Sequence, residues 1–373
     1  MSVSLPSQDR GALGFGEKLL TLLDTGSFTA TYKYAVLLAL VDLCLEHSSR
    51  SGAAPDVLTT RQLADKVLEV YWPHTAPFAG GGEDRILLQN TGGQAEIVSL
   101  IRRFREREVR TPLATLAESR AAAPEGFRRL VDHIEWKLVE MPLPRLQMFG
   151  NRHDPFIYQI AWDASIRQGD MHGSDFDNRL HLLDGAGDHL VRLAGLLRPL
   201  VQRQWAAMVS RLNRDRLQDS ALEEFLFGAT RISLERVRDP LRELQDERCF
   251  YCGERLRATP EVDHFLPWAR YPDNGIENLV VADRACNNSK RDFLAASAHL
   301  DRWRERFTAS ATTAAQLQEI AESRTWDRHP ERTLSVARAI YLRLPEDAKL
   351  WAGRREFVDL DRGTLETLLG GAA

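Results

Sequence analysis

Three of the four cysteines of this 373-residue chain, Cys249, Cys252 and Cys286, flank one short polar segment. The first two are separated by two residues and followed by Gly253, a spacing at which two thiolates can bind one soft metal ion behind a tight turn. Four cysteines are too few for a disulfide framework in a chain of this length. Cys44 lies alone in an apolar stretch, where a buried and inert thiol is expected. The chemistry is therefore expected around the other three.

The segment after the first cysteine pair predicts strand, loop, strand and helix in that order. Residues 261–266 alternate as a strand does and place the carboxylate of Asp263 next to the imidazole of His264. The residues that follow are rich in Pro, Asp, Asn and Gly, which is typical of a turn. Residues 278–281, an asparagine followed by three apolar residues, are expected to be the returning strand, and the residues from Asp283 onward are expected to form a helix.

This order of elements allows Asp263, His264 and Asn287 to converge on one site. An Asp and an Asn supply oxygen ligands suited to Mg²⁺ or Mn²⁺. A neutral histidine beside them can take a proton from water near pH 7. A metal ion with oxygen ligands and an imidazole base are together the catalytic groups that hydrolysis of a phosphodiester bond requires.

The same segment resembles the HNH endonuclease motif with its ββα-metal fold, in a variant with a zinc knuckle. His264 matches the first motif position, Asn278 the second and Asn287 the third, while Asp263 matches the usual metal carboxylate and Lys290 the lysine common after the last position. A Cys-x-Tyr-Cys-Gly segment before the motif and an Asn-Leu-Val segment before the helix match as well. The resemblance covers about an eighth of the chain.

The resemblance implies a role for each matched residue. His264 would be the general base, and Asp263 and Asn287 would hold one catalytic Mg²⁺ or Mn²⁺. Asn278 would brace the loop through backbone hydrogen bonds and fix the orientation of the histidine.

Three cations in or near the motif, Lys290, Arg270 and Arg291, are candidates for contact with nucleic-acid phosphates. Each is open to a second interpretation, in which it is a solvated surface cation without such a role.

The segment departs from the family in its second cysteine pair. Related zinc-bearing proteins carry two Cys-x-x-Cys pairs, whereas this chain has Asp283-x-x-Cys286 in place of the second one. A structural Zn²⁺ bound by Cys249, Cys252, Cys286 and Asp283 is chemically permissible because carboxylates also ligate zinc. Two alternatives stay open: the three thiols pack without a metal, or another ligand completes the site.

The whole chain is predicted to be mainly α with small β elements, with α-helical N- and C-terminal regions around the ββα-metal HNH module. Four regions are expected: a helical, winged-helix-like 1–120, a mixed 121–230, the nuclease module 231–307 and a helical 308–373. Helices are predicted at residues 28–47, 58–72 and 94–107, and also at 189–217, where Pro199 is expected to kink or split the helix. Residues 141–149 are expected to be extended.

One N-terminal helix carries a basic cluster, Arg102, Arg103 and Arg105, which would suit nucleic-acid binding. The alternative is a solvated helix face, because Glu106 and Glu108 lie among the arginines. The chain as a whole has 49 basic and 53 acidic residues and a net charge of −4, so a nucleic-acid site must be a local patch.

The sequence shows no signal for secretion and no apolar run long enough to cross a bilayer, so a cytoplasmic protein without a membrane partner is expected. The resemblance implies a metal-dependent endonuclease that acts on DNA, in restriction or anti-phage defence by analogy with bacterial relatives. The alternative is a non-catalytic, zinc-stabilised DNA-binding regulator, and an RNA substrate is also open. A single-site nuclease cuts both strands with two copies or in two encounters, which leaves a homodimer as an alternative to a monomer.

Overall fold

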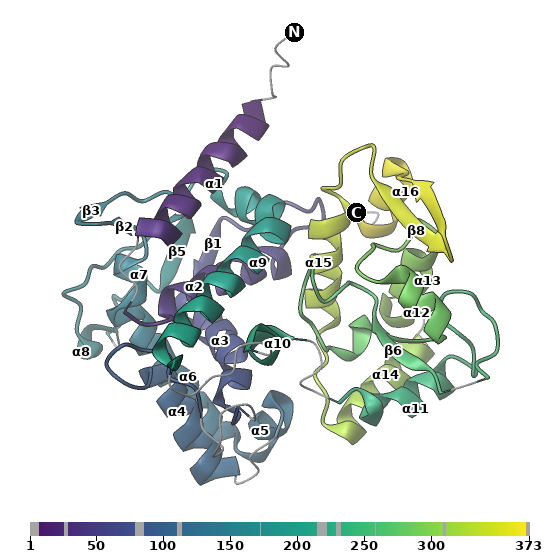
Figure 1. The fold of residues 1–373 in the computed structure, drawn as a ribbon, viewed down its shortest axis with the longest axis horizontal. Helices are drawn as coiled ribbons and strands as arrows, with labels where there is room; N and C mark the ends of the chain where they lie inside the picture. The colour runs from purple at the N-terminus through teal and green to yellow at the C-terminus, as the bar shows by residue number, and fades with distance from the viewer. Residues whose placement is uncertain are drawn as a thin grey trace. The chain divides into compact units, whose positions relative to one another are not determined.

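The computed structural model describes residues 7–25, 29–78, 86–109, 114–171, 173–214, 222–228, 233–257, 259–308 and 311–370. The chain forms two compact units (Figure 1), Met1–Cys44 with Ala54–Arg231 as unit 1 and Leu45–Ala53 with Ile232–Ala373 as unit 2. The predicted regions 1–120 and 121–230 fall in unit 1, except for residues 45–53, which belong to unit 2. Residue 231, the first of the next predicted region, is grouped with unit 1 and lies outside the described residues. The rest of the predicted region 231–307 and the whole of 308–373 fall in unit 2.

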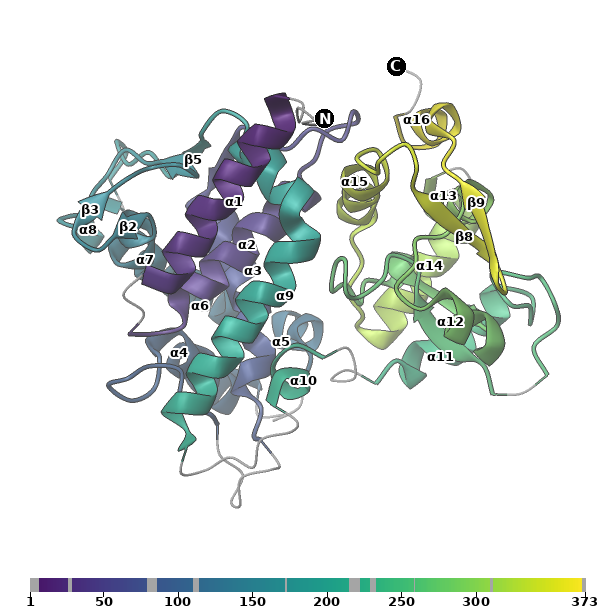
Figure 2. The ribbon, with the colours of Figure 1, turned by 45° about the horizontal axis from the view of Figure 1, so that its top comes forward.

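Unit 1 is built mostly from helices. These are α1 (Ser7–Thr25), α2 (Tyr32–Glu46, whose last residues belong to unit 2), α3 (Thr60–Tyr71), α4 (Glu96–Phe104), α5 (Leu116–Ala122), α6 (Pro124–Glu140), α7 (Pro142–Arg145), α8 (Gln168–Met171), α9 (Ala186–Leu212) and α10 (Leu222–Phe227), with short turns at Trp72–Thr75 (η1) and Arg105–Val109 (η2). The sequence of α2 is apolar on every side, and accordingly the helix is buried over nearly its whole length. Helices α1 and α9 lie side by side (Figure 2).

The strands of unit 1 are short. Strand β1 (Val57–Thr59) pairs with β5 (Arg179–Leu182), which pairs with β4 (Tyr158–Gln159), and β2 (Met148–Phe149) pairs with β3 (Arg152–His153); all these pairs are antiparallel. Thr59 ends β1 and caps α3, where its hydroxyl and the side chain of Gln62 form a capping box. Because the partners of β1 lie beyond residue 120, the sheet joins the two predicted N-terminal regions.

The structure decides between two expected outcomes at Pro199 and corrects the expectation for residues 141–149. Residues 186–212 form one continuous helix, α9, with Pro199 inside it, whereas a split was one of the two expected outcomes. The proline lies on an exposed face, and burial of Val201, Trp205 and neighbouring side chains holds the helix together on the other side. Residues 141–149 are not extended throughout, because α7 forms one helical turn that begins with a proline, which suits the first position of a helix.

Unit 2 has the predicted order of strand, loop, strand and helix at its centre. Strand β6 (Glu261–His264) pairs antiparallel with β7 (Leu279–Ala282), in a register that places His264 opposite Leu279. A short 3-10 turn, η5 (Ile276–Asn278), leads into β7, and α12 (Arg284–Lys290) follows it. The surrounding helices are α11 (Glu235–Leu244), α13 (Ser297–Thr308), α14 (Ala311–Arg324), α15 (Pro330–Tyr341) and α16 (Arg362–Gly370). The prediction of a mainly helical chain with small β elements is confirmed.

The C-terminal region also contains a hairpin that the sequence analysis did not predict. Strands β8 (Lys349–Gly353) and β9 (Glu356–Asp359) pair antiparallel, and β8 packs against α12, where the indole nitrogen of Trp351 donates to the hydroxyl of Ser289 at 3.1 Å. The hairpin is therefore part of the packing around the central motif. No helix among the described residues is both long and apolar enough to span a membrane.

Candidate active site and metal cluster

One cleft of about 480 Å³ lies where β6, the loop after it and α12 meet. Asp263 and His264 reach it from the end of β6, and Asn287 reaches it from α12, so the three residues predicted to converge line one cavity. The remaining lining residues are Pro267, Trp268, Asn288, Arg291 and Asp292. Oxygen donors, an imidazole and a cation thus surround the same open space.

Asp263 is held through one of its two carboxylate oxygens. Its Oδ2 accepts a hydrogen bond from the hydroxyl of Tyr251 at 2.5 Å and lies 3.0 Å from the ammonium of Lys290. Burial is the main cause that raises the pKa of Tyr251 well above its usual range, and the charge of Asp263 is the second. The hydroxyl therefore stays protonated and acts as a donor. Oδ1 has no hydrogen-bond partner among the described residues, which leaves it available to a ligand in the cleft.

His264 is buried, and one of its ring nitrogens is fixed. Nε2 lies 2.8 Å from Oδ1 of Asn274, in the loop between the strands. An amide oxygen can only accept, so Nε2 carries the hydrogen and Nδ1 of the neutral ring carries the lone pair. Burial lowers the pKa of His264 below its usual value, although the bond to Asn274 and the charge of Asp263 oppose this. The ring is therefore neutral near pH 7 and able to accept a proton at Nδ1.

Asn287 is oriented by a carboxylate two residues before Asp263. Its amide nitrogen donates to Oε2 of Glu261 at 2.7 Å. Glu261 and Asp263 share a face of β6 because side chains alternate along a strand. The bond distinguishes the two ends of the amide, and the carbonyl oxygen of Asn287, which has no partner among the described residues, is left as a ligand atom.

Asn278 lies at the other end of the loop and is fully buried. Its side chain accepts from the backbone nitrogen of Leu266 at 2.8 Å and donates to the backbone oxygens of Leu266 and Asp273 at 3.2 and 3.0 Å. It ties the two ends of the loop together. The histidine ring itself is bonded to Asn274, which directly follows Asp273, so any effect of Asn278 on the ring passes through the loop.

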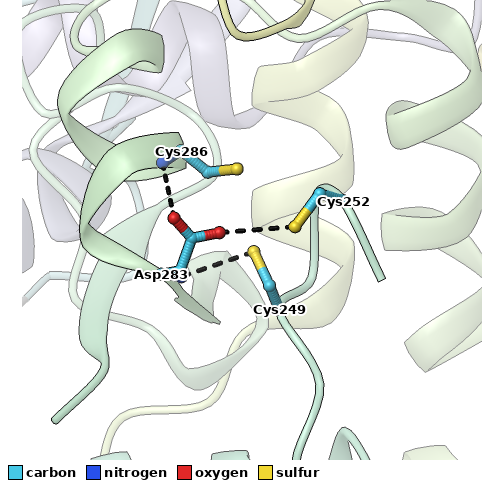
Figure 3. A group of neighbouring side chains, drawn as sticks. All are labelled: Cys249, Cys252, Asp283 and Cys286. Atoms are coloured by element: carbon cyan, nitrogen blue, oxygen red, sulfur yellow. Dashed lines mark hydrogen bonds between the residues drawn. The ribbon is translucent and has the colours of Figure 1, made fainter. Parts of the chain in front are cut away.

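A second group of polar side chains lies at the start of α12 (Figure 3). Cys249, Cys252, Asp283 and Cys286 each offer a ligand atom, and these atoms all lie within 4.8 Å of one another. Asp283 caps α12 by accepting from the backbone nitrogens of Ala285 and Cys286 through Oδ1, and its Oδ2 lies 3.3 Å from the sulfur of Cys252 (Figure 3). The group can hold a metal ion, and its three sulfurs favour a soft one.

The electrostatics of this cluster are set by burial and by Asp283. Burial raises the pKa of the Cys249 thiol to about 11 and also raises the pKa of Cys286. Burial would raise the pKa of Asp283 too, but hydrogen bonds, foremost those from Cys286, lower it below its usual range. A guanidinium nitrogen of Arg354, just after β8, lies 2.8 Å from Asp283 Oδ1. A metal ion that binds here must therefore displace protons from thiols that otherwise keep them.

A family model described as HNH endonuclease matches residues 249–296. These residues form an HNH endonuclease domain. The match spans the cysteine cluster, both strands and α12, and so includes β6, the loop and α12 that form the cleft. No curated protein and no solved structure matches the chain.

The three cations of the HNH domain that were candidates for phosphate contact differ in their exposure. Arg291 is exposed and lines the cleft, and Arg270 is exposed in the turn after Pro267. The expectation that Lys290 is a phosphate contact or a surface cation is corrected, because the residue is fully buried. Its ammonium donates to the backbone oxygen of His264 at 2.8 Å and pairs with Asp263. A lysine with no exposed surface cannot reach a phosphate, and this one holds the two residues at the end of β6.

The basic cluster in unit 1 is also corrected in part. Arg105 is buried, stacks 4.7 Å from the ring of Trp72 and donates to the hydroxyl of Thr75 at 2.6 Å. It is a packing residue and not a nucleic-acid contact. Arg102 and Arg103 are exposed on α4, where Arg102 pairs with Glu106 one turn away.

Four residues that position the HNH site were not predicted from the sequence: Tyr251, Glu261, Asn274 and Arg354. Glu261 could have been found from the two-residue period of β6, which places it beside Asp263. Tyr251 lies between the first two cysteines, and Asn274 lies in the turn-rich loop, but neither pattern states which atom it faces. Arg354 carries no sequence signal, because it reaches the cluster from a distant hairpin.

Proposed function

We propose that the HNH domain is a metal-dependent endonuclease that hydrolyses phosphodiester bonds of DNA. One observation supports this most directly. Asp263, His264 and Asn287 line one cleft, and each is held through one atom while a second polar atom has no partner in the part of the chain that the structure describes. Such preorganisation is what catalysis requires, because the reactive groups need not rearrange during the reaction.

In the proposed reaction, Nδ1 of His264 takes a proton from a water molecule as the oxygen of that water attacks phosphorus. The bond between phosphorus and the 3′ oxygen breaks, so the products carry a 5′-phosphate and a 3′-hydroxyl. Solvent protonates the departing 3′ oxygen. The bond from Nε2 to Asn274 stabilises the imidazolium that forms, since Nε2 carries its hydrogen throughout.

The donor set in the cleft fits Mg²⁺ or Mn²⁺. Oδ1 of Asp263 and the amide oxygen of Asn287 are hard ligand atoms on residues that line the cavity, and neither atom has a partner among the described residues. When bound, such an ion supplies positive charge that stabilises the negative charge on the leaving oxygen. Lys290 and Tyr251 hold the carboxylate in place through Oδ2.

The decisive experiment incubates the full-length protein with supercoiled plasmid and Mg²⁺ or Mn²⁺. Wild type is expected to nick the plasmid, and His264→Ala is expected to lose about 10²–10⁴-fold in rate, as removal of a general base does. His133→Ala, which changes an exposed histidine on α6 in unit 1, is the matched control and should cut at the wild-type rate. No nicking by wild type, or an unchanged rate in His264→Ala, would contradict the proposal.

We also propose that the cysteine cluster binds a structural Zn²⁺ that joins the Cys249 turn to the start of α12. Three sulfurs and one carboxylate at mutual distances within 4.8 Å suit a tetrahedral site. Elemental analysis of the purified chain should give one zinc, and Cys286→Ser and Asp283→Asn should release it. The asparagine keeps the ability to cap α12, so loss of zinc from this variant reports ligation. Cys44→Ser, a buried thiol elsewhere, should leave the zinc content unchanged.

The second candidate function is a non-catalytic, zinc-stabilised DNA-binding regulator. Metal-independent binding of DNA without cutting would favour it. The bonds that orient Asp263, His264 and Asn287 argue against it, because a binding module has no use for a histidine held in one tautomer. Assays with single-stranded and duplex RNA, run in parallel with DNA, test whether the substrate is RNA. A role in restriction or anti-phage defence rests on family analogy and adds no prediction about the chemistry.

A further inference from the structure

The loop between β6 and β7 is held by a segment that lies outside the family-matched residues 249–296. This segment, residues 326–333, connects α14 to the first turn of α15. It belongs to the same unit as the HNH domain. Its contacts tie part of the C-terminal region to the nuclease motif.

The backbone of the loop is bonded to the segment at two points. The indole nitrogen of Trp326 donates to the backbone oxygen of Asn274 at 2.6 Å. The backbone nitrogen of Ile276 donates to the backbone oxygen of Asp327 at 3.0 Å. Because these bonds lie on either side of Gly275, they fix the backbone at the tip of the loop.

Two buried carboxylates of the loop find their partners in the same segment. Asp273 lies 3.1 Å from a guanidinium nitrogen of Arg332 and accepts from the hydroxyl of Thr333 at 3.3 Å. Glu277, fully buried, accepts from the backbone nitrogen of His329 at 3.0 Å and lies 3.4 Å from Arg328. A buried carboxylate is costly without such partners, so the loop conformation depends on the segment.

Asn274 connects this loop to the catalytic histidine. Its backbone oxygen is fixed by Trp326, and its side-chain oxygen accepts from Nε2 of His264. We infer that Trp326 is a positioning residue of the nuclease, which acts through Asn274 to hold His264 in the tautomer that leaves Nδ1 free to accept a proton. The inference extends the proposed function, but its main test does not depend on nuclease activity.

The test measures the tautomer of His264 in the full-length protein, with ¹⁵N-labelled histidine and a pH at which the ring is neutral. His264→Gln identifies the signals. Wild type is expected to show hydrogen on Nε2, and Asn274→Ala should show a mixture of both tautomers. Asn274→Asp, which retains an acceptor oxygen, should restore the wild-type tautomer. Trp326→Phe removes the indole N–H while keeping an aromatic ring, and it should shift the ring toward the mixture.

The matched control is Trp162→Phe in unit 1. Trp162 also donates its indole N–H to a backbone oxygen, that of Val139 at 3.1 Å, so the same bond is lost far from the loop in sequence. The tautomer should stay as in wild type. A wild-type tautomer in Trp326→Phe would overturn the inference, provided that the near-ultraviolet circular dichroism spectrum shows the variant to be folded.

Nicking assays at saturating DNA give the second readout. Asn274→Ala is expected to lower kcat by about 10–100-fold and Trp326→Phe by about 3–10-fold, with KM for DNA unchanged, because a misplaced catalytic group slows the chemical step. The double variant should be no slower than Asn274→Ala alone, since both changes act on one residue. Additive losses would overturn the inference. Absence of nicking by wild type would contradict the proposed function. The tautomer measurement would still decide whether Trp326 positions His264.

Discussion

Each unit contains a buried ion pair between a carboxylate and a cation, but the two pairs do different things. In unit 1, Asp42 of α2 pairs with Arg198 of α9, with side chains 6% and 4% exposed. In unit 2, Asp263 of β6 pairs with Lys290 of α12, with side chains 11% and 0% exposed. The first joins two long helices inside a core, whereas the second lies beneath a cleft whose surface its carboxylate forms.

The difference shows which property distinguishes a structural pair from a positioning pair. Both cations are buried and cannot reach a ligand. Asp263 borders the cleft, and its contacts from Tyr251 and Lys290 go to the same oxygen. A carboxylate held on one side and open on the other is prepared for binding, so the accessibility of the acid, not the burial of its partner, carries the functional meaning.

The largest expected effect is on stability in unit 1. Arg198→Met should lower the free energy of unfolding by about 3–5 kcal/mol, because it leaves Asp42 buried without a counter-charge. Urea denaturation followed by circular dichroism measures the loss. The double variant Asp42→Leu, Arg198→Met should recover most of it, since an apolar pair of similar volume replaces a buried ion pair at little cost. A double variant as unstable as the single one would show that the pair is not the cause.

A similar change in unit 2 should act mainly on catalysis. Lys290→Met is expected to lower kcat for nicking by about 100-fold, because Asp263 loses one of the two contacts that orient it. The free energy of unfolding should fall by about 1–3 kcal/mol, less than for Arg198→Met, since the cleft lets water solvate the carboxylate. KM for DNA should stay unchanged. A rise in KM at constant kcat would instead make Lys290 a phosphate contact and would break the comparison.

Removal of the other contact to Asp263 should have a smaller effect. Tyr251→Phe deletes one hydrogen bond to Oδ2 and keeps the aromatic ring that packs 5.1 Å from Trp351. We expect kcat to fall about tenfold, with little change in the thermal midpoint of unfolding, because Lys290 still holds the same oxygen. Tyr341→Phe, which removes a buried hydroxyl bonded to the backbone oxygen of Ala295, is the control and should leave kcat unchanged. Equal losses of kcat in the two variants would assign the effect to general destabilisation.

The central motif could be predicted because its information is local. The alternation of residues 261–266, the turn-rich loop and the mostly apolar run at 278–281 each specify their own element. A short connection then brings Asp263 and His264 next to the helix that carries Asn287. The order strand, loop, strand and helix, and the gathering of these residues around one cleft, follow from sequence spacing alone.

The remainder depends on distant parts of the chain. Trp326 lies 52 positions from Asn274, and no period or spacing relates them. Lys290 reads as a surface cation on a short helix, and only the packing of Tyr251 and β6 around it shows that it is buried. Arg105 is misread for the same reason, because Thr75 and Trp72 cover it from a different helix. The sequence thus predicts which residues carry the chemistry better than which residues hold them in place.

The smallest expected effects concern the arginines of α4, which are exposed where the two cations compared above are buried. Arg102 and Glu106 are 57% and 55% exposed, and Arg103 bonds only to the backbone oxygen of Ser99 among the described residues. Alanine at either arginine should change the free energy of unfolding by less than about 0.5 kcal/mol, because water solvates both charges.

The same two variants separate a nucleic-acid surface from a solvated helix face. If α4 contacts phosphates, Arg103→Ala should reduce the slope of log affinity for DNA against log salt by about one. Arg102→Ala should reduce it less, because Glu106 already neutralises much of that charge. Fluorescence anisotropy with a labelled duplex at several salt concentrations measures both slopes. Unchanged slopes in both variants would assign these arginines to the solvated face and leave substrate binding to Arg270 and Arg291 in unit 2.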